Sequence, residues 1–228
     1  MTIRSTRIDE LALITLDRPQ ALNALNAALL RDLAAAFDQV AAGDARALLV
    51  AGAGDKAFCA GADLRELQGR SLAAARADAA FGQRVFGKLD KLPIPSIALV
   101  HGYAFGGGLE LALACTFRIA APDSRLGLPE ITLGLMPGYG GTQRLPRFVG
   151  AARALELILS GRTVTADEAL AIGLVNRIAE GDLLAAGCAF AREMTGWSRV
   201  ALRLAREAVE RGLSRPLSEG LAIEADLN

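Results

Sequence analysis

The chain has 228 residues, of which 52% are hydrophobic, and its 25 basic and 25 acidic side chains cancel. This length suits one large domain, or one domain with an appendage, that buries a sizeable core. Because the charges balance, there is no basic excess of the kind that is typical of proteins that bind nucleic acids or membrane surfaces. The sequence has no run of about 18 apolar residues, so no membrane span is expected.

Cysteine and histidine usage excludes several common kinds of site. The three cysteines share no metal-binding or redox spacing, and without an N-terminal secretion signal they favour a reducing, cytoplasmic environment. The single histidine, His101, leaves no histidine-rich metal site, so no metal is expected. The sequence also has no Gly-x-Ser-x-Gly nucleophile motif and no phosphate-binding Gly-x-x-x-x-Gly-Lys-Ser/Thr motif.

The first half of the chain alternates between strand-like and helix-like segments. Residues 3–7 and 11–16 are predicted to form a hairpin, and Asn23 or Asn26 is expected to cap the helix that follows. Further on we expect a strand at 45–50, a turn at 56–63, a helix at 71–89, a strand at 96–100, a helix at 108–115 and a strand at 116–120.

The second half ends in helices. After a glycine-dense segment at 134–146 we expect helices at 151–159 and 166–171, a short strand near 174–178, and helices at 181–195 and 198–211. Apolar strands that alternate with helices predict an α/β layered fold. The composition becomes purely helical around Trp197, so we divide the chain into a core, 1–195, and a helical C-terminal region, 196–228.

The main chemical feature is the run Gly106-Gly-Gly108, which links a predicted strand to a predicted helix. Glycine lets a ligand approach main-chain N–H groups, and a helix N-terminus leaves such groups unpaired. A second small-residue turn, 60–63, also precedes a helical pattern. If the two turns face each other they form an oxyanion hole, in which one donor lowers a barrier by roughly 3–4 kcal/mol.

Two carboxylates follow the Gly106–Gly108 turn: Glu110 inside an apolar helix, and Glu130 after Pro129. Paired carboxylates in an apolar pocket acquire different pKa values, so that one acts as acid and the other as base, as chemistry through an enolate requires. Structural explanations remain open beside this one. The glycines also suit tight packing, Glu110 a helix dipole, Glu130 a solvated loop and Asp63 a helix cap.

Four segments resemble, in order and approximate spacing, motifs of the enoyl-CoA hydratase/isomerase (crotonase) family. They are Ala57-Phe-Cys-Ala-Gly-Ala-Asp63, Gly102-Tyr-Ala-Phe-Gly-Gly-Gly-Leu-Glu-Leu111, Leu128-Pro-Glu-Ile131 and Pro137-Gly-Tyr-Gly-Gly-Thr-Gln-Arg-Leu-Pro146. The resemblance covers nearly the whole chain. It implies a crotonase-like α/β spiral of ββα repeats, whose helical C-terminal region drives assembly into homotrimers that often pair into hexamers.

The resemblance also implies the substrate and the site. The substrate is an acyl-CoA thioester, as in fatty-acid β-oxidation, and no metal or redox cofactor is needed. The oxyanion-hole donors fall on the N–H groups of Ala62 and Gly107, and the two hydratase glutamates on Glu110 and Glu130. Substrate contacts are implied for Ala60, Gly61, Ala62, Asp63, Leu64, Gly106 and Gly107, and more weakly for Ala21 and Leu22.

Because both glutamates are present, the favoured reaction is hydration of a 2-trans-enoyl-CoA. Glu110 then activates water and Glu130 delivers a proton to the α-carbon. Three alternatives stay open: a Δ3,Δ2-enoyl-CoA isomerase that uses Glu130 alone, a methylglutaconyl-CoA hydratase, and a non-catalytic crotonase-fold binding protein. The second is included because residues 106–115 and 141–147 resemble the methylglutaconyl-CoA hydratase branch of the family. RNA binding, known in that branch, is disfavoured because 71–90 mixes basic and acidic residues.

Two features depart from the family pattern. Thr116 stands where relatives often have Asp, and relatives continue beyond the segment that ends here at Asn228. We therefore expect a shortened C-terminal region. The side chains that line the acyl pocket are expected to come from 71–89 and from the C-terminal region by which relatives extend further.

Overall fold

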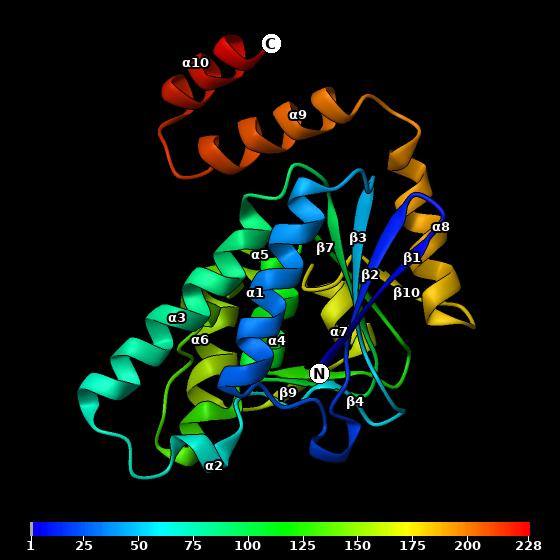
Figure 1. Ribbon diagram of the computed structural model, residues 1–228. Helices are drawn as coiled ribbons and strands as arrows, with labels where there is room; N and C mark the ends of the chain where they lie inside the picture. Colours follow the sequence, from blue (N-terminus) through cyan, green and yellow to red (C-terminus); the bar gives the residue numbers. More distant parts are fainter. Residues whose placement is uncertain (1) are drawn as a thin grey trace.

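Two sheets with helices packed around them make up the computed structural model, which describes residues 2–228 (Figure 1). Within these residues the larger sheet has six strands, in the order β1 (Ile3–Ile8), β2 (Leu11–Leu16), β3 (Ala47–Gly52), β5 (Ser96–Val100), β7 (Phe117–Ala120) and β10 (Arg177–Ile178). The smaller sheet has four, in the order β4 (Ala57–Cys59), β6 (Tyr103–Phe105), β8 (Arg125–Gly127) and β9 (Thr163–Thr165).

Three consecutive strand pairs connect the sheets. In each pair, β3–β4, β5–β6 and β7–β8, the first strand joins the larger sheet and the second joins the smaller one. Helical segments follow the pairs: α2 (Leu64–Leu67) and α3 (Leu72–Asp90), then α4 (Gly107–Ala114), then η2 (Pro129–Leu133) and α5 (Gly141–Val149). Since equivalent strands run parallel, the chain winds as a spiral of ββα turns, which confirms the predicted α/β spiral.

The central strands β3 and β5 of the larger sheet are buried on both faces, as their apolar sequences predict, whereas the edge strand β1 is mostly exposed. Leu48 and Val50 of β3 pack in the main core, together with buried residues of α1 (Ala27–Ala42), α3 and α4. The alternate residues Ala47 and Leu49 face a smaller cluster, which α8 (Leu183–Thr195) covers. The elements that approach the site therefore rest on a continuous apolar core.

The predicted N-terminal hairpin is confirmed, and Asn26 rather than Asn23 caps α1, its side chain accepting from the Leu29 N–H at 2.8 Å. Asn23 is instead fully buried and donates to the carbonyls of Ala53 and Ala57, which ties the loop before α1 to β4. Thr116 exchanges hydrogen bonds with Ser96 of the neighbouring strand, so its side chain has a structural role.

The helices predicted in the second half are confirmed, among them α6 (Ala151–Ser160) and α7 (Ala166–Ala171). Two features of the structure were not predicted. The smaller sheet has no counterpart in the sequence analysis, because three-residue strands are too short to show a period. The segment 134–146 is irregular only as far as Gly140, since Gly141 begins α5 with Pro146 inside the helix.

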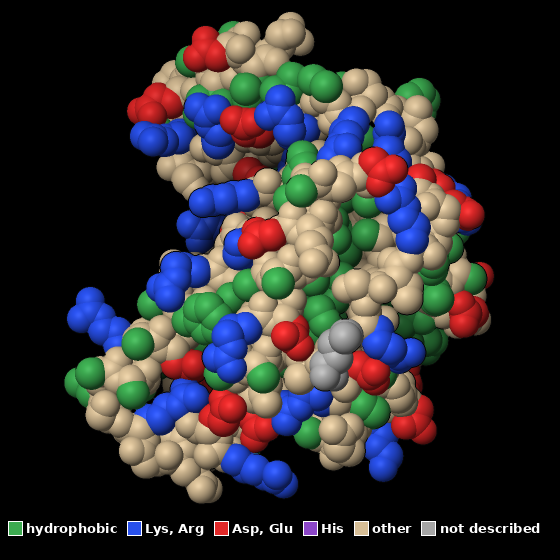
Figure 2. All heavy atoms as spheres, viewed as in Figure 1, with side chains coloured by type: hydrophobic (Ala, Val, Ile, Leu, Met, Phe, Trp, Pro, Cys, Tyr) green, Lys and Arg blue, Asp and Glu red, His purple; other side chains and the backbone are tan. Residues whose placement is uncertain are grey.

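The C-terminal helices α9 (Arg199–Gly212) and α10 (Leu217–Leu227) extend beyond the core and contain no buried residues (Figure 1). Figure 2 shows them as a lobe with a hollow between it and α3, and with basic and acidic side chains interspersed. No helix within residues 2–228 is long and apolar enough to cross a membrane.

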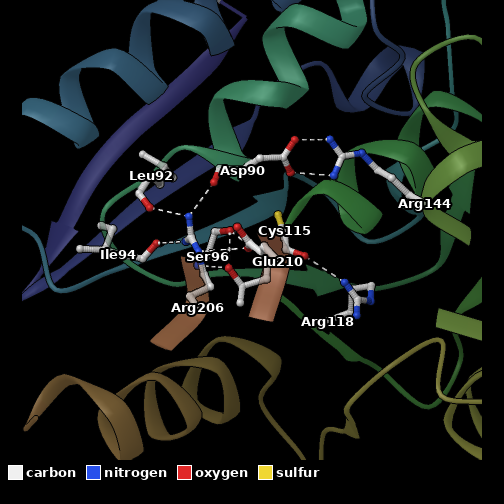
Figure 3. Close-up of polar contacts among 10 residues, drawn as sticks. Asp90, Leu92, Ile94, Ser96, Cys115, Arg118, Arg144, Arg206 and Glu210 are labelled. Carbon is white, nitrogen blue, oxygen red and sulfur yellow. Dashed lines mark hydrogen bonds and ion pairs between the residues drawn. The ribbon is translucent and has the colours of Figure 1, made fainter. Parts of the chain in front are cut away.

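Arg206 makes the most extensive side-chain contact between this lobe and the core. Arg206 of α9 donates to the carbonyls of Asp90, Leu92 and Ile94 at 2.8, 2.6 and 2.8 Å, at the end of α3 (Figure 3). The side chain of Asp90 in turn pairs with both terminal nitrogens of Arg144 in α5. The last turn of α3 thus links the lobe to the helix that follows the site.

Candidate active site

A cavity of about 640 Å³ lies between the end of β4, helix α3, the start of α4 and the segment from η2 to α5. Its walls are mainly apolar. Among the residues predicted to act on or bind the substrate, those in the wall are Ala60, Gly61, Ala62, Leu64, Gly106, Gly107, Glu110 and Glu130.

The two glycine-containing turns meet, as the oxyanion-hole prediction requires. Gly61 has φ +104°, and a Cβ there would lie 3.0 Å from the Phe105 carbonyl and 3.7 Å from the Gly107 nitrogen. A Cβ on Gly108 would lie 2.0 Å from the Cys59 carbonyl oxygen, so a side chain would separate the two turns. The absence of side chains is what lets β4 end against the start of α4.

The N–H groups of Ala62 and Gly107 are both available at this junction. Ala62 forms an isolated parallel β-bridge with Leu25, but the two hydrogen bonds of the bridge involve its neighbours. The Leu25 N–H donates to the Gly61 carbonyl, and the Asp63 N–H donates to the Leu25 carbonyl. Gly107 is the first residue of α4, a position whose N–H lacks an intrahelical acceptor. Within residues 2–228, the hydrogen bonds outside regular helices and strands give neither N–H an acceptor.

Glu110 lies in the first turn of α4, which is buried along its whole length. Only 1% of the residue is exposed, and its Oε1 accepts from the Tyr139 N–H at 2.8 Å and the Gly141 N–H at 2.7 Å. Burial raises its pKa to about 7, and the charge of Glu130 adds to the rise, while the peptide N–H groups oppose it. With Oε1 occupied, Oε2 is the oxygen available to a molecule in the cavity.

Glu130 lies in η2 and is only partly buried. Its Oε1 would be 3.0 Å from a Cβ on Gly106, which places the carboxylate beside the start of α4. Its Oε2 is shielded from solvent and has no hydrogen-bond partner within residues 2–228. Burial raises its pKa as well. Glu130 is therefore partly removed from solvent rather than a fully solvated loop residue.

Three predicted contact residues lie beside the cavity rather than in its wall. Asp63 caps α2 through the Arg65 N–H and pairs with Arg18 at 3.0 Å. Leu22 accepts from the Ala60 N–H at 3.0 Å, and Ala21 precedes it. These residues lie within or next to the 60–64 strip, and their contact with coenzyme A stays a prediction.

The sequence analysis missed the residues that hold Glu110. These contacts come from the peptide N–H groups of Tyr139 and Gly141, which no side-chain pattern reveals. The only signal in the sequence is the Gly-Tyr-Gly-Gly tract that contains them. The expectation that 71–89 lines the pocket is confirmed, since Ala75, Asp78, Ala79 and Gln83 of α3 form one wall. Within residues 2–228 no three or more His, Cys, Asp or Glu side chains cluster as a metal site.

Comparison with known sequences identifies the family. The family model described as enoyl-CoA hydratase/isomerase matches residues 6–228. A crotonyl-CoA hydratase from Syntrophomonas wolfei is 41% identical over 220 residues, which cover 96% of this chain and 85% of the relative. A short-chain-enoyl-CoA hydratase from Clostridium acetobutylicum is 39% identical over 219 residues, with 95% and 84% covered.

Solved structures agree in fold. The crystal structure of an enoyl-CoA hydratase from Bacillus anthracis superimposes with a TM-score of 0.96 at 39% identity, covering 100% of this chain and 89% of that one. One from Thermoplasma volcanium gives a TM-score of 0.95 at 33% identity, covering 100% and 90%. These matches confirm the crotonase-like spiral over the whole chain, and the protein belongs to the enoyl-CoA hydratase/isomerase family.

Proposed function

We propose that this protein is an enoyl-CoA hydratase, a lyase that adds water across the 2-trans double bond of an enoyl-CoA thioester. The observation that carries the proposal is the convergence of Glu110 and Glu130 at the Gly106–Gly107 turn, inside one cavity. The names of the relatives, which include crotonyl-CoA and short-chain-enoyl-CoA hydratases, support the same activity.

In the proposed reaction the thioester oxygen binds between the N–H groups of Ala62 and Gly107. These donors stabilise the negative charge that develops on that oxygen and make the β-carbon electrophilic. Glu110, through Oε2, takes a proton from water as its oxygen bonds to the β-carbon. Glu130 gives its proton to the α-carbon, and a later proton transfer from Glu110 to Glu130 restores both groups, so that one molecule of water is added in each turnover.

The environments of the two carboxylates differ. Burial raises both pKa values, that of Glu110 to about 7, and the charge of Glu130 adds to the rise at Glu110, so the two groups titrate as a coupled pair. Glu110 accepts two peptide hydrogen bonds, which fix one of its oxygens, whereas Glu130 Oε2 has no donor within residues 2–228. The roles proposed here, Glu110 as base and Glu130 as acid, follow the family pattern and this difference in how the two carboxylates are held.

Several further properties belong to the proposal. The backbone donors polarise the thioester without a metal or redox cofactor. A short enoyl chain is the first substrate to test, given the names of the relatives. Homotrimers, alone or paired as hexamers, are proposed because α9 and α10 expose Val209, Leu213, Leu217 and Leu221. A cytoplasmic location is supported by three free, buried cysteines.

The experiment that tests the proposal follows the loss of enoyl-thioester absorbance when crotonyl-CoA is mixed with the protein. We expect hydration, at a rate that EDTA leaves unchanged. A 3-enoyl-CoA serves as the second substrate. A protein that isomerises the 3-enoyl-CoA and leaves crotonyl-CoA unchanged would replace the hydratase proposal with an isomerase.

A further inference from the structure

The peptide that holds Glu110 belongs to an irregular segment. Residues 134–140 contain no helix or strand, and Leu135 and Met136 are 45% and 69% exposed. The Tyr139 N–H must nevertheless stay within hydrogen-bond distance of Glu110 Oε1. Something outside this segment has to fix the position of Tyr139.

Helix α3 supplies that support with two side chains. Gln83 Nε2 donates to the Gly138 carbonyl at 2.8 Å, and the Tyr139 hydroxyl donates to Asp78 Oδ2 at 2.9 Å. The Tyr139 ring lies against Gly82, where a Cβ would come within 2.3 Å of it, and meets Phe86 edge to face at 5.6 Å. The tyrosine is thus held along its whole length by one helix.

Asp78 is itself held in place. Arg70 Nη1 lies 2.7 Å from Asp78 Oδ2, and the two side chains are only 20% and 18% exposed. The same Oδ2 accepts from the Tyr139 hydroxyl, so Arg70 and Tyr139 meet at one carboxylate oxygen. Burial, followed by the Asp78 charge, raises the pKa of Tyr139, so its hydroxyl keeps the proton that it donates. The result is one chain of contacts, Arg70–Asp78–Tyr139–Glu110.

We propose that Asp78 and Tyr139 are positioning residues, which orient the carboxylate of Glu110 through the Tyr139 peptide N–H. This inference rests on the proposed function and deepens it. Asp78 and Gln83 also line the cavity, so the wall against which the acyl chain packs is the one that positions the base. The fit of the acyl chain against α3 therefore affects turnover as well as binding.

The first test is Tyr139→Phe, which keeps the ring and removes only the bond to Asp78. We expect kcat for crotonyl-CoA to fall about tenfold, in the range of one hydrogen bond to a charged group, with KM within about threefold. Tyr103→Phe is the matched control, because Tyr103 is the only other tyrosine and its 43%-exposed side chain lies outside the cavity wall. The control should keep the wild-type rate.

The pH profile separates positioning from a loss of folded protein. Weakening the Tyr139 N–H bond to Glu110 removes an interaction that lowers the pKa of Glu110, so the rising limb of kcat should move to higher pH. The charged groups that face Glu110 are Glu130 from η2 and, through Tyr139, Asp78 from α3; Tyr139→Phe leaves both in place. A purely structural role would scale the profile at every pH without moving the limb.

A double-variant cycle with Asp78→Ala completes the test, with thermal melting to confirm that each variant folds. If the two residues act through one bond, the double variant loses no more kcat than the worse single variant. Additive losses, or an unmoved limb in Tyr139→Phe, would overturn the inference and leave the hydratase proposal intact. A wild type that hydrates no enoyl-CoA would overturn both.

Discussion

Glu110 and Glu130 face the same cavity from two very different segments. The helix around Glu110 is buried at every position, and two peptide N–H groups hold one of its oxygens. The short η2 helix around Glu130 contains no buried residue, and its neighbours Ile131 and Leu133 are 43% and 55% exposed. A carboxylate that must aim at a water molecule is fixed, whereas one that hands over a proton has room to move.

The comparison extends to the contacts of each carboxylate. Burial is the main cause of the raised pKa of Glu110 and peptide donors oppose it, whereas no donor within residues 2–228 contacts Glu130 Oε2. The orientation of Glu110 is thus set by the backbone around it, and its pKa mainly by burial.

The largest effects are expected when each of the two carboxyl groups is replaced in turn by an amide. Glu110→Gln and Glu130→Gln should each lower the crotonyl-CoA hydration rate by at least about 10²-fold, the range of general acid–base catalysis. Steady-state kinetics measure this, with the exposed residue Glu180→Gln as a control that keeps the wild-type rate. Full activity in either active-site variant would show that the two carboxylates do not act as a pair.

A smaller loss is expected when the support of Glu110 is changed and the carboxylate is kept. A Cβ on Gly141 would lie 3.1 Å from both Cγ and Oε1 of Glu110, so Gly141→Ala should push the carboxylate aside and lower kcat about tenfold or more. Gly87→Ala is the matched control, because its Cβ meets only Asp90 Oδ2, at 3.9 Å. Equal rates in the two variants would mean that the position of Glu110 is not critical.

The last effect is on stability rather than on rate, and it also separates the two carboxylates. The folded-state pKa of Glu110, about 7, lies above the ordinary 4.5, so its contribution to stability is present below pH 4.5 and is lost as the pH rises through 7. Glu110→Gln removes that loss and should gain about 3 kcal/mol of unfolding free energy relative to wild type between pH 4.5 and pH 8.

Glu130→Gln should show a gain of the same sign that is smaller, because Glu130 is less buried. Urea denaturation at both pH values measures the two gains. A wild type and a Glu110→Gln variant whose stabilities change equally with pH would contradict the burial of a titrating Glu110.

The sequence predicts the parts of this site that depend on residue type. Three adjacent glycines, a carboxylate in an apolar helix and Pro129-Glu130 are visible without coordinates, and so are the helices that show periodic apolar positions. The resemblance to a family then assigned roles that the residues alone left open.

What the sequence does not predict depends on packing between distant segments. The smaller sheet consists of three-residue strands that pair only because the spiral brings them together. The N–H groups that hold Glu110 come from 29 and 31 residues away, and Asp78 reaches Tyr139 across 61 residues. None of these groups has a side-chain pattern that points to its partner.

The central claim is that Glu110 handles the water and Glu130 the α-proton. It is tested most directly by deuterium uptake at the α-carbon of butyryl-CoA in D₂O, a saturated thioester that cannot be hydrated. We predict uptake with wild type and with Glu110→Gln, and a loss of at least about 10²-fold with Glu130→Gln. Uptake that survives in Glu130→Gln, or that disappears in Glu110→Gln, would contradict the assignment of the two carboxylates.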